Sequence, residues 1–405
     1  MFSPLKDLRR LLHLDTPPLE AKKSATGGIL AMYHHGQPVW TPRDYTSLAR
    51  EGYASNAIAY RCVRMIAEAA ASIPWLIYDD GRELDTHPLL QLLSAPNPNQ
   101  GGTEFMEEWY GYLQISGNSY LEAVSVAGEV KELYALRPDR MKVVPGPNGW
   151  PQAYEYTVGE RMVKFGNDGD DTASAILHMA LFHPTNDYYG MSPLEVAAIA
   201  IDIHNAAGSW NKSLLDNSAR PSGALVFKGL GGTSNLTQDQ FERLKSELEN
   251  TYQGATNAGR PLLLEGGLDW KSMGLSPKDM DFIEAKHVAA REIALAFGVP
   301  PMLLGIPGDN TFANYQEANK TFWRQTVIPL VGKTAKSLTR WLRPHFGSEI
   351  RLWYDLDQIT ALQVEREALW NRVGAADFLT TNEKRAAVGY DPVKGGDKPP
   401  TVSSL

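Results

Sequence analysis

Cysteine is almost missing from this sequence: Cys62 is the single one among 405 residues. One cysteine excludes an internal disulfide and any zinc site built from cysteines. Cys62 falls on the apolar face of a predicted helix. We therefore interpret it as a buried thiol with no part in chemistry.

Long apolar runs are also missing. No stretch approaches the roughly 20 residues that span a bilayer, and residues 1–15 lack the apolar core and cleavage site of a secretion signal. We therefore expect a protein that is made and kept in the cytoplasm and has no membrane partner.

Positive charge is not in excess, because the formal net charge is −8. A protein that grips nucleic acid over a broad surface needs clustered Lys and Arg to replace the counterions of the phosphates. The negative net charge argues against a protein that binds nucleic acid over a broad surface, but it does not exclude a protein through which DNA passes without tight binding. The chain is long enough for one large core or for two to three domains.

Two strings imitate catalytic motifs. VIPLVGKT, residues 327–334, resembles a P-loop, but Val327 stands where the motif needs glycine and the segment is predicted to be helical. Residues 190–194 begin like a nucleophile elbow without its final glycine. We interpret Ser192 as a helix N-cap and the first string as part of a helix.

Candidate metal ligands are few. His178 and His183 share a strand-like run, and a metal pair is one interpretation, but packing or hydrogen bonding is favoured because further ligands are not evident. Asp170 and Asp171 belong to a Gly/Asn/Asp turn. The sequence thus predicts no catalytic site, no metal and no cofactor.

The stretch from Ser276 to Arg343 has the strongest local signals. A helix is expected to begin at Ser276 and to end before Gly298. Residues 303–311 are too rich in Gly and Pro for regular structure. A second helix is expected from Phe312 to Leu342, with a kink at Pro329 because proline removes a backbone donor.

The rest predicts an α+β fold. A helix over 56–73 precedes a strand at 75–78 that turns at Asp80 and Gly81, and further helices are expected after 88 and from 103. A helix opens at Ser192-Pro193 and runs to Asn217. The other expected strands are 120–126, 130–136, 141–144, 153–158, 223–227, 260–264, 268–273 and 350–354, and the other helices are 236–252 with Thr237 as its cap, 360–373 and 381–388.

Five blocks carry a family resemblance. They are NAIAYRCVRMIAEAAASIPW at 56–75, SGNSYLEAV at 116–124, YYGMSPLEVA at 188–197, FGVPPMLLGIPGDNTFANYQEANKTFWRQTVIPLV at 297–331 and LTTNEKRAAVGYDPVKGGD at 379–397. In their order and spacing they resemble the HK97-type portal proteins of tailed bacteriophages and gene transfer agents.

The resemblance implies a portal fold and its division of the chain. The expected parts are a flexible N-terminal arm (1–27), the first part of an α/β wing (28–190), stem helix 1 (191–218), a small α/β clip (219–275), stem helix 2 (276–299), a tunnel loop (300–314), a kinked tunnel helix with the second part of the wing (315–358), a helical crown (359–392) and a disordered tail (393–405).

The resemblance also implies the function. A portal subunit forms a ring, expected to be a dodecamer, at one capsid vertex of a virion or phage-like particle. The ring is a conduit for double-stranded DNA in packaging and ejection, and its implied partners are the large terminase, a head–tail adaptor and the major capsid protein. Such a subunit is not an enzyme.

Two sets of residues follow as site candidates. The tunnel loop is implied to face DNA, although a surface connector is the plainer interpretation; its candidates are Ile306, Asp309, Asn310, Thr311, Phe312 and Asn314. A basic helical face contacts either the adjacent subunit, which we favour, or DNA; it consists of Lys320, Arg324, Lys333, Lys336, Arg340 and Arg343.

Two other classes of function stay open on the sequence. One is a cytoplasmic α+β enzyme with a site between the first domain and the helices of Ser192 to Phe297. The other is a nucleic-acid-binding module, for which direct DNA binding should depend steeply on salt. The sequence does not distinguish a phage from a gene transfer agent.

Overall fold

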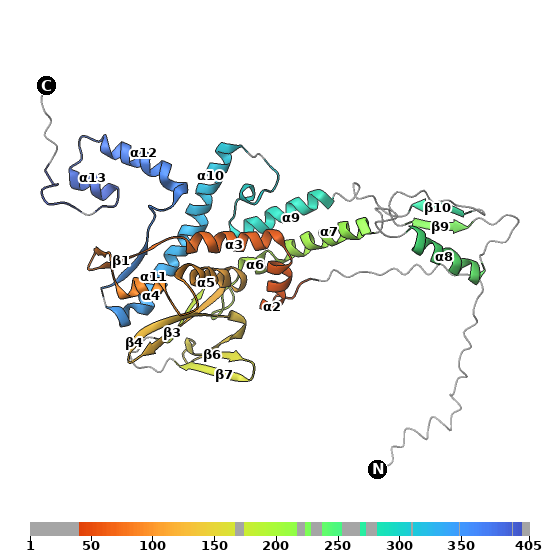
Figure 1. The fold of residues 1–405 in the computed structure, drawn as a ribbon, viewed down its shortest axis with the longest axis horizontal. Coiled ribbons are helices and arrows are strands. Elements are labelled where there is room, and N and C mark those ends of the chain that lie inside the picture. The colour runs from red at the N-terminus through yellow and green to blue at the C-terminus, as the bar shows by residue number, and fades with distance from the viewer. Residues whose placement is uncertain are drawn as a thin grey trace, which may run out of the picture. The chain divides into compact units, whose positions relative to one another are not determined.

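The computed structural model describes residues 40–166, 174–216, 223–227, 237–252, 268–272, 282–308, 311–347, 349–390 and 392–398. Contacts divide the chain into two units (Figure 1). The smaller consists of Met1–Pro38 and Asn211–Met280, and the larger of Val39–Trp210 and Asp281–Leu405.

Three helices form the centre of the larger unit: α3 (Ala57–Ala71), α5 (Gly102–Ser116) and α11 (Ile328–Phe346). The side-chain oxygen of Asn56 caps α3 by accepting from the amides of Ile58 and Ala59. Cys62 is fully buried among apolar side chains, as predicted, and burial raises the pKa of its thiol to about 12. Trp109 of α5 is buried as well and donates to Thr334 Oγ1 of α11 over 3.4 Å.

A small sheet joins an early and a late segment of the chain within the larger unit. Its strand order is β11–β1–β2, from Arg351–Tyr354, Trp75–Asp79 and Arg82–Leu84. Ile77 of β1 lies opposite Leu352 of β11 in the antiparallel register. The turn between β1 and β2 has positive φ at Asp80 (44°) and Gly81 (75°), which suits the right-handed twist of a two-residue hairpin.

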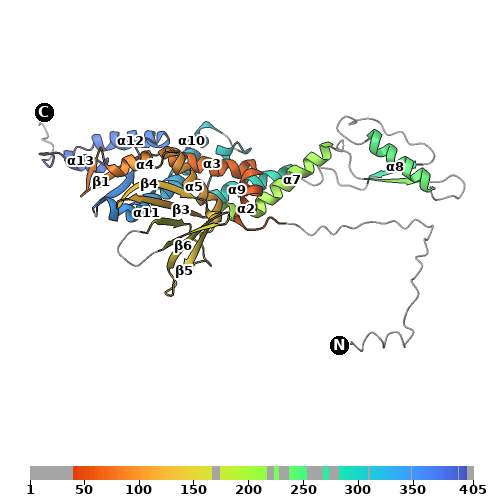
Figure 2. The ribbon, with the colours of Figure 1, turned by 60° about the horizontal axis from the view of Figure 1, so that its bottom comes forward.

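Two further three-stranded sheets lie beside the helices (Figures 1 and 2). One has the order β4–β3–β8, from Glu129–Leu136, Asn118–Val126 and Ile176–Ala180. The other has the order β5–β6–β7, from Met141–Pro145, Pro151–Val158 and Arg161–Gly166. β7 was not predicted, because its exposed side chains do not alternate with buried ones. A second buried cluster joins the sheets: Tyr120, Leu136, Met141, Val143, Tyr154 and Ile176.

Short helices surround this centre. They are α2 (Tyr45–Ser47), the π-helical Leu48–Ala54 and α4 (Pro88–Ser94).

α6 (Pro193–Val196) begins where it was predicted, because Ser192 Oγ accepts from the amide of Glu195 at 2.9 Å, and α7 (Ala198–Asp216) follows it. α9 (Phe282–Phe297) packs against α6. Its expected cap, Ser276, lies outside the described residues.

The smaller unit contains the predicted insert. β9 (Gly223–Phe227) pairs antiparallel with β10 (Leu268–Ser272), and α8 (Gln238–Tyr252) lies between them in the chain. Thr237 caps α8, since its Oγ1 accepts from the amide of Gln240 and its own amide donates to Gln240 Oε1 at 3.0 Å. The strand expected at 260–264 lies outside the described residues.

The long helical segment changes its backbone hydrogen bonding next to Pro329, where a kink was predicted. α10 (Phe312–Phe322) passes into a π-helical stretch, Trp323–Val327, and α11 begins at Ile328. The π-helical turn directly before the proline redistributes backbone bonds where the proline has no N–H. α11 continues through Pro344 to Phe346, beyond the predicted Leu342.

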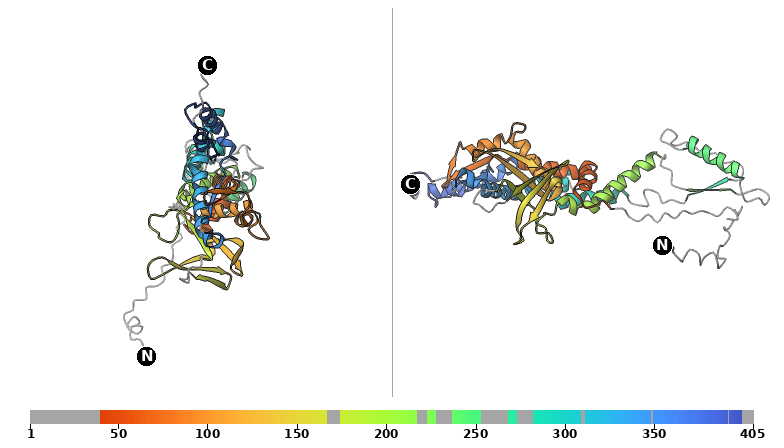
Figure 3. Two further views of the ribbon diagram at one scale, coloured as in Figure 1. Left: turned by 90° about the vertical axis from the view of Figure 1, so that its left-hand side faces the viewer. Right: turned by 90° about the horizontal axis from the view of Figure 1, so that it is seen from below.

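The C-terminal piece contains α12 (Gln363–Gly374) and α13 (Thr381–Ala387). The expectation of a disordered tail from residue 393 was wrong for 393–398. Asn382 of α13 donates to the Val393 carbonyl and to Asp397 Oδ1, and its own Oδ1 accepts from the Val393 amide. One buried carboxamide thus holds this segment on α13, which belongs to the dark blue C-terminal helices in the two views of Figure 3.

Candidate channel-facing loop and basic helix face

The loop that follows α9 starts with a well-defined turn. The Gly298 amide donates to the Leu295 carbonyl and the Val299 amide to that of Ala294, and Gly298 has a φ of +66°. This is the left-handed end of a helix that glycine favours. A 3₁₀ turn, Pro301–Leu304, comes next and ends at Gly305, whose φ is +71°.

Ile306 is buried, which corrects the expectation that it faces a channel. It is 5% exposed and packs with Ala290 and Ala294 of α9. Its amide donates to the Pro301 carbonyl at 3.2 Å. A loop side chain that packs against the preceding helix anchors the base of the loop and does not form its tip.

Two polar contacts hold the base of the loop. Arg291 Nη2 donates to the Pro307 carbonyl at 2.6 Å, and Thr326 Oγ1 donates to the Gly298 carbonyl at 2.6 Å. Neither residue was singled out from the sequence. A side chain that binds a backbone carbonyl leaves no spacing or pairing pattern that sequence analysis can find.

The far side of the loop is exposed. Thr311 caps α10 by accepting from the amide of Asn314 at 3.2 Å. Phe312 follows with 77% of its surface exposed, and Tyr315 with 48%. Asp309 and Asn310 lie outside the described residues. The structure therefore brings Thr311, Phe312 and Asn314 together at the start of α10 and leaves Ile306 apart from them.

The six basic candidates separate into two groups. Lys320 forms an ion pair with Glu317 at 2.7 Å, and Arg324 pairs with Glu365 of α12. The other four are exposed on one face of α11 at spacings of three, four and three residues: Lys333, Lys336, Arg340 and Arg343. Within this second group, Arg343 Nη2 lies 3.5 Å from the Ile350 carbonyl.

The P-loop imitation is part of α11. Gly332 lies within the helix, where an added Cβ would come 3.3 Å from the hydroxyl of Tyr354. The hydroxyl of Thr334 donates to the Leu330 carbonyl at 3.1 Å. A P-loop needs a strand followed by a loop with free amides, so this segment cannot cradle phosphates.

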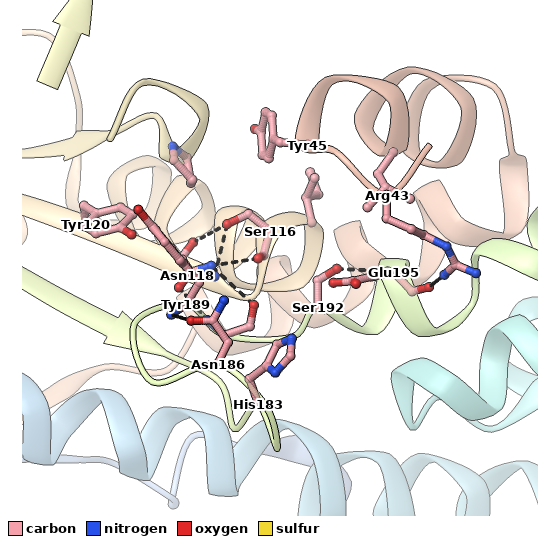
Figure 4. Close-up of a pocket in the computed structure, with 14 residues that line it drawn as sticks. Arg43, Tyr45, Ser116, Asn118, Tyr120, His183, Asn186, Tyr189, Ser192 and Glu195 are labelled. Atoms are coloured by element: carbon pink, nitrogen blue, oxygen red, sulfur yellow. Dashed lines mark hydrogen bonds between the residues drawn. The ribbon is translucent and has the colours of Figure 1, made fainter. Parts of the chain in front are cut away.

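A pocket of about 290 Å³ lies between α2, β3 and α6, in the region where the enzyme interpretation placed a site (Figure 4). Two of its polar side chains, Asn118 and Arg43, have structural partners, whereas the buried hydroxyl of Tyr120 has no hydrogen-bond partner among the described residues. Asn118 Oδ1 accepts from the Gly190 amide at 2.8 Å, and Arg43 donates to the Glu195 carbonyl. The pocket is thus a joint that fixes residues 181–192 against β3.

His178 supports the same joint. Its ring stacks on Tyr120 with 4.3 Å between ring centres, and its Nε2 donates to Asn118 Oδ1 at 3.1 Å. Burial lowers the pKa of His178 to about 4, so the ring is neutral at pH 7. The predicted packing and hydrogen bonding are confirmed, and His183 instead accepts from the Thr185 amide.

The described residues contain no group of three His, Cys, Asp or Glu arranged to hold a metal ion. Among the same residues, no helix is long and apolar enough to cross a bilayer.

Solved structures share this fold. A chain of the structure described as the neck of an empty GTA (gene transfer agent) particle computed with C6 symmetry is 53% identical, with a TM-score of 0.71. The match covers 91% of this chain and all of that one. An HK97 family phage portal protein from Corynebacterium diphtheriae has the same fold at 14% identity and a TM-score of 0.56, with 80% and 99% of the chains covered. The fold is that of portal subunits.

Sequence relatives agree. The profile of the phage portal protein family matches residues 57–389. The portal protein of Enterobacteria phage HK97 is 25% identical over 87% of this chain and 82% of its own. A Rickettsia bellii protein described as uncharacterized is 45% identical over 86% of this chain and 90% of its own. The chain belongs to the phage portal protein family.

Proposed function

We propose that this chain is the subunit of a closed ring of twelve copies that forms the portal vertex and neck of a gene transfer agent or related phage-like particle. Double-stranded DNA passes along the axis of the ring during packaging and ejection. The observation that carries the proposal is the 53% identity, over nearly the whole chain, to a chain in the neck of a gene transfer agent particle. A similar chain occurs in a neck computed with C12 symmetry.

The tunnel loop faces the axis in this proposal, with Thr311, Phe312 and Asn314 joining Asp309 and Asn310. What supports it is the contrast between an exposed far side and an anchored base. Phe312 is 77% exposed, whereas Ile306, Arg291 and Thr326 tie the near side to α9 and the π-helical turn. Such a loop can shift against moving DNA without disturbing the helices that carry it.

The proposed partners follow the parts of the chain. The insert of β9, α8 and β10 is the docking surface for the large terminase and later for a head–tail adaptor, and the sheets β4–β3–β8 and β5–β6–β7 form the wing against the major capsid protein. The hydrolysis of ATP that drives packaging belongs to the terminase. The helical state of Gly332 and Thr334 is consistent with that division of labour.

Negative-stain microscopy of the purified full chain, combined with light scattering after size exclusion, tests the proposal. We expect annular particles with a central hole and a mass near twelve subunits. Small oligomers without a hole, under conditions that keep the protein folded, would contradict it. Direct DNA binding that falls steeply with added salt would instead favour a nucleic-acid-binding module.

A further inference from the structure

We propose that four cations on α11 of one copy dock against an acidic hairpin of the next copy. The basic ridge consists of Lys333, Lys336, Arg340 and Arg343. The acidic hairpin is the β1–β2 turn with Asp79, Asp80, Glu83 and Asp85. The inference rests on the proposed ring, and it names the charged surfaces that join its neighbours.

The basic ridge has spare charge. Within the described part of the chain, Lys333, Lys336 and Arg340 have no ion-pair partner, and all three are exposed. The opposite face of α11 is buried against the core through Leu338 and Leu342. From Lys333 to Arg343 the ridge covers about 15 Å, at the rise of an α-helix.

The acidic hairpin has spare charge of the opposite sign. Four exposed carboxylates lie within seven residues that contain one cation, Arg82. One further cation, Arg351 of β11, lies over the ring of Tyr78. Glu83 accepts a hydrogen bond from the Tyr78 hydroxyl at 3.2 Å, which leaves its negative charge uncompensated. No ion pair of the other three, Asp79, Asp80 and Asp85, occurs among the described residues.

The hairpin is held in shape before it meets a partner. Asp80 and Gly81 both have positive φ, as a tight two-residue turn between twisted strands requires. β1 pairs with β11 on its other side, so the hairpin cannot swing freely. From the turn to Asp85 it extends about 13 Å, at the rise of a strand, which is close to the length of the ridge.

The two surfaces lie at one end of the larger unit but do not meet within one chain. Tyr78 pairs with Arg351, which follows closely on the end of α11, and Figures 1 and 2 both place β1 and α11 at that end. β11 separates β1 from α11 in the fold. A ring of identical chains joins two different surfaces of the same subunit, and opposite charges on them select the correct neighbour.

DNA is the competing occupant of the ridge, since phosphates also attract Lys and Arg. We favour a second copy because the same chain supplies a surface of matching length and opposite charge. Attraction between exposed charges is screened within about 10 Å at 0.1 M salt. Ring assembly should therefore weaken as salt is raised.

A charge-swap experiment tests the inference. One variant is Lys336→Glu with Arg340→Glu, which keeps good helix formers on α11. The other is Glu83→Lys with Asp85→Lys, two positions on the same face of the hairpin. Each variant alone should form at least about tenfold fewer rings than the wild type, because its ridge and its hairpin then carry charge of the same sign. An equimolar mixture should restore the rings. When the two variants alternate around the ring, every contact joins a ridge and a hairpin of opposite charge.

The control is Arg161→Glu with Lys164→Glu, two exposed cations on β7, which should leave rings intact. Circular dichroism confirms that each variant is folded. The inference is overturned if the ridge variant alone forms rings, or if the mixture forms no more rings than either variant by itself. If the ridge variant keeps its rings but loses DNA binding, DNA is the occupant of the ridge. If the wild type itself forms no rings, the proposed function fails, and sedimentation velocity on the same mixture still decides whether the two surfaces pair.

Discussion

Thr326 and Gly298 join the two sides of the proposed tunnel loop: the hydroxyl of Thr326, in the π-helical turn, donates to the carbonyl of Gly298 at the end of α9 over 2.6 Å. Twenty-eight positions separate them in the chain. The contact fixes the distance between the two helices that carry the loop. We therefore expect motion of the loop to be confined to its far side.

Replacing Thr326 with Val keeps the shape of the side chain and removes this donor. We expect a loss of about 1 kcal/mol of stability, the net value of a typical hydrogen bond. Hydrogen exchange should rise at residues 298–306. Thr326→Ser, which keeps the hydroxyl, is the matched control and should exchange like the wild type.

Gly298→Ala should be more harmful than Thr326→Val. A side chain at a φ of +66° is strained, and the added Cβ would lie 2.9 Å from Thr326 Oγ1. We expect a loss of about 1–3 kcal/mol in the free energy of unfolding, measured by urea titration. Gly111→Ala within α5, where nothing lies near the new Cβ, should be neutral or stabilising.

Thiol labelling separates the buried anchor of the loop from its exposed side. Ile306→Cys should react slowly with a maleimide, because residue 306 is 5% exposed, whereas Phe312→Cys should react quickly. The native Cys62 gives little background, since it is buried and the pKa of its thiol is raised to about 12. Equal rates at the two positions would show that Ile306 is not buried in solution.

His178 should make stability depend on pH. Its pKa falls from 6.5 in the unfolded chain to about 4 in the folded one. Between these values the unfolded state binds more protons, so acid favours unfolding, and about 3 kcal/mol should be lost as the pH falls through this window. His178→Gln keeps an N–H for Asn118 but does not titrate. Comparing urea midpoints of the two proteins at pH 7 and pH 4.5 isolates this contribution from that of the carboxylates.

Asn382 should control the segment that follows α13. Replacing it with Ala removes the carboxamide that binds Val393 and Asp397. We expect faster proteolysis around residues 393–397, with the thermal unfolding of the core unchanged. Asn382→Asp should act in the same direction, because its carboxylate would face Asp397 and could not donate. An unchanged cleavage rate in both variants would argue against this role.

The order of helices and strands could be predicted from local signals. Ser192 and Thr237 cap their helices as the sequence suggested, Asp80-Gly81 forms the hairpin turn, and a π-helical turn lies directly before Pro329. These features depend on residues close together in the chain. The family could be assigned for a related reason, because the order of short blocks survives in the sequence itself.

The sequence did not predict the pairing of β1 with β11 or the burial of Ile306. Strand pairing across nearly 280 residues leaves no local pattern. Ile306 looked like a loop residue because its Gly and Pro neighbours exclude regular structure, yet small residues on α9 open a gap that it fills. The tail was misjudged in the same way, since one Asn on α13 supplies the hydrogen bonds that hold it.

The sequence by itself thus determined where the helices, turns and caps lie, and to which family the chain belongs, since these depend on neighbours within a few positions. Only the tertiary structure decided which loop residues are anchors and which are exposed. It also separated the cations of α10 and the π-helical turn, which pair within the chain, from those of α11, which remain unpaired within the described residues. Burial and ion pairing depend on residues that are far apart in the sequence and close together in the fold. The local sequence pattern does not show which of these residues come into contact.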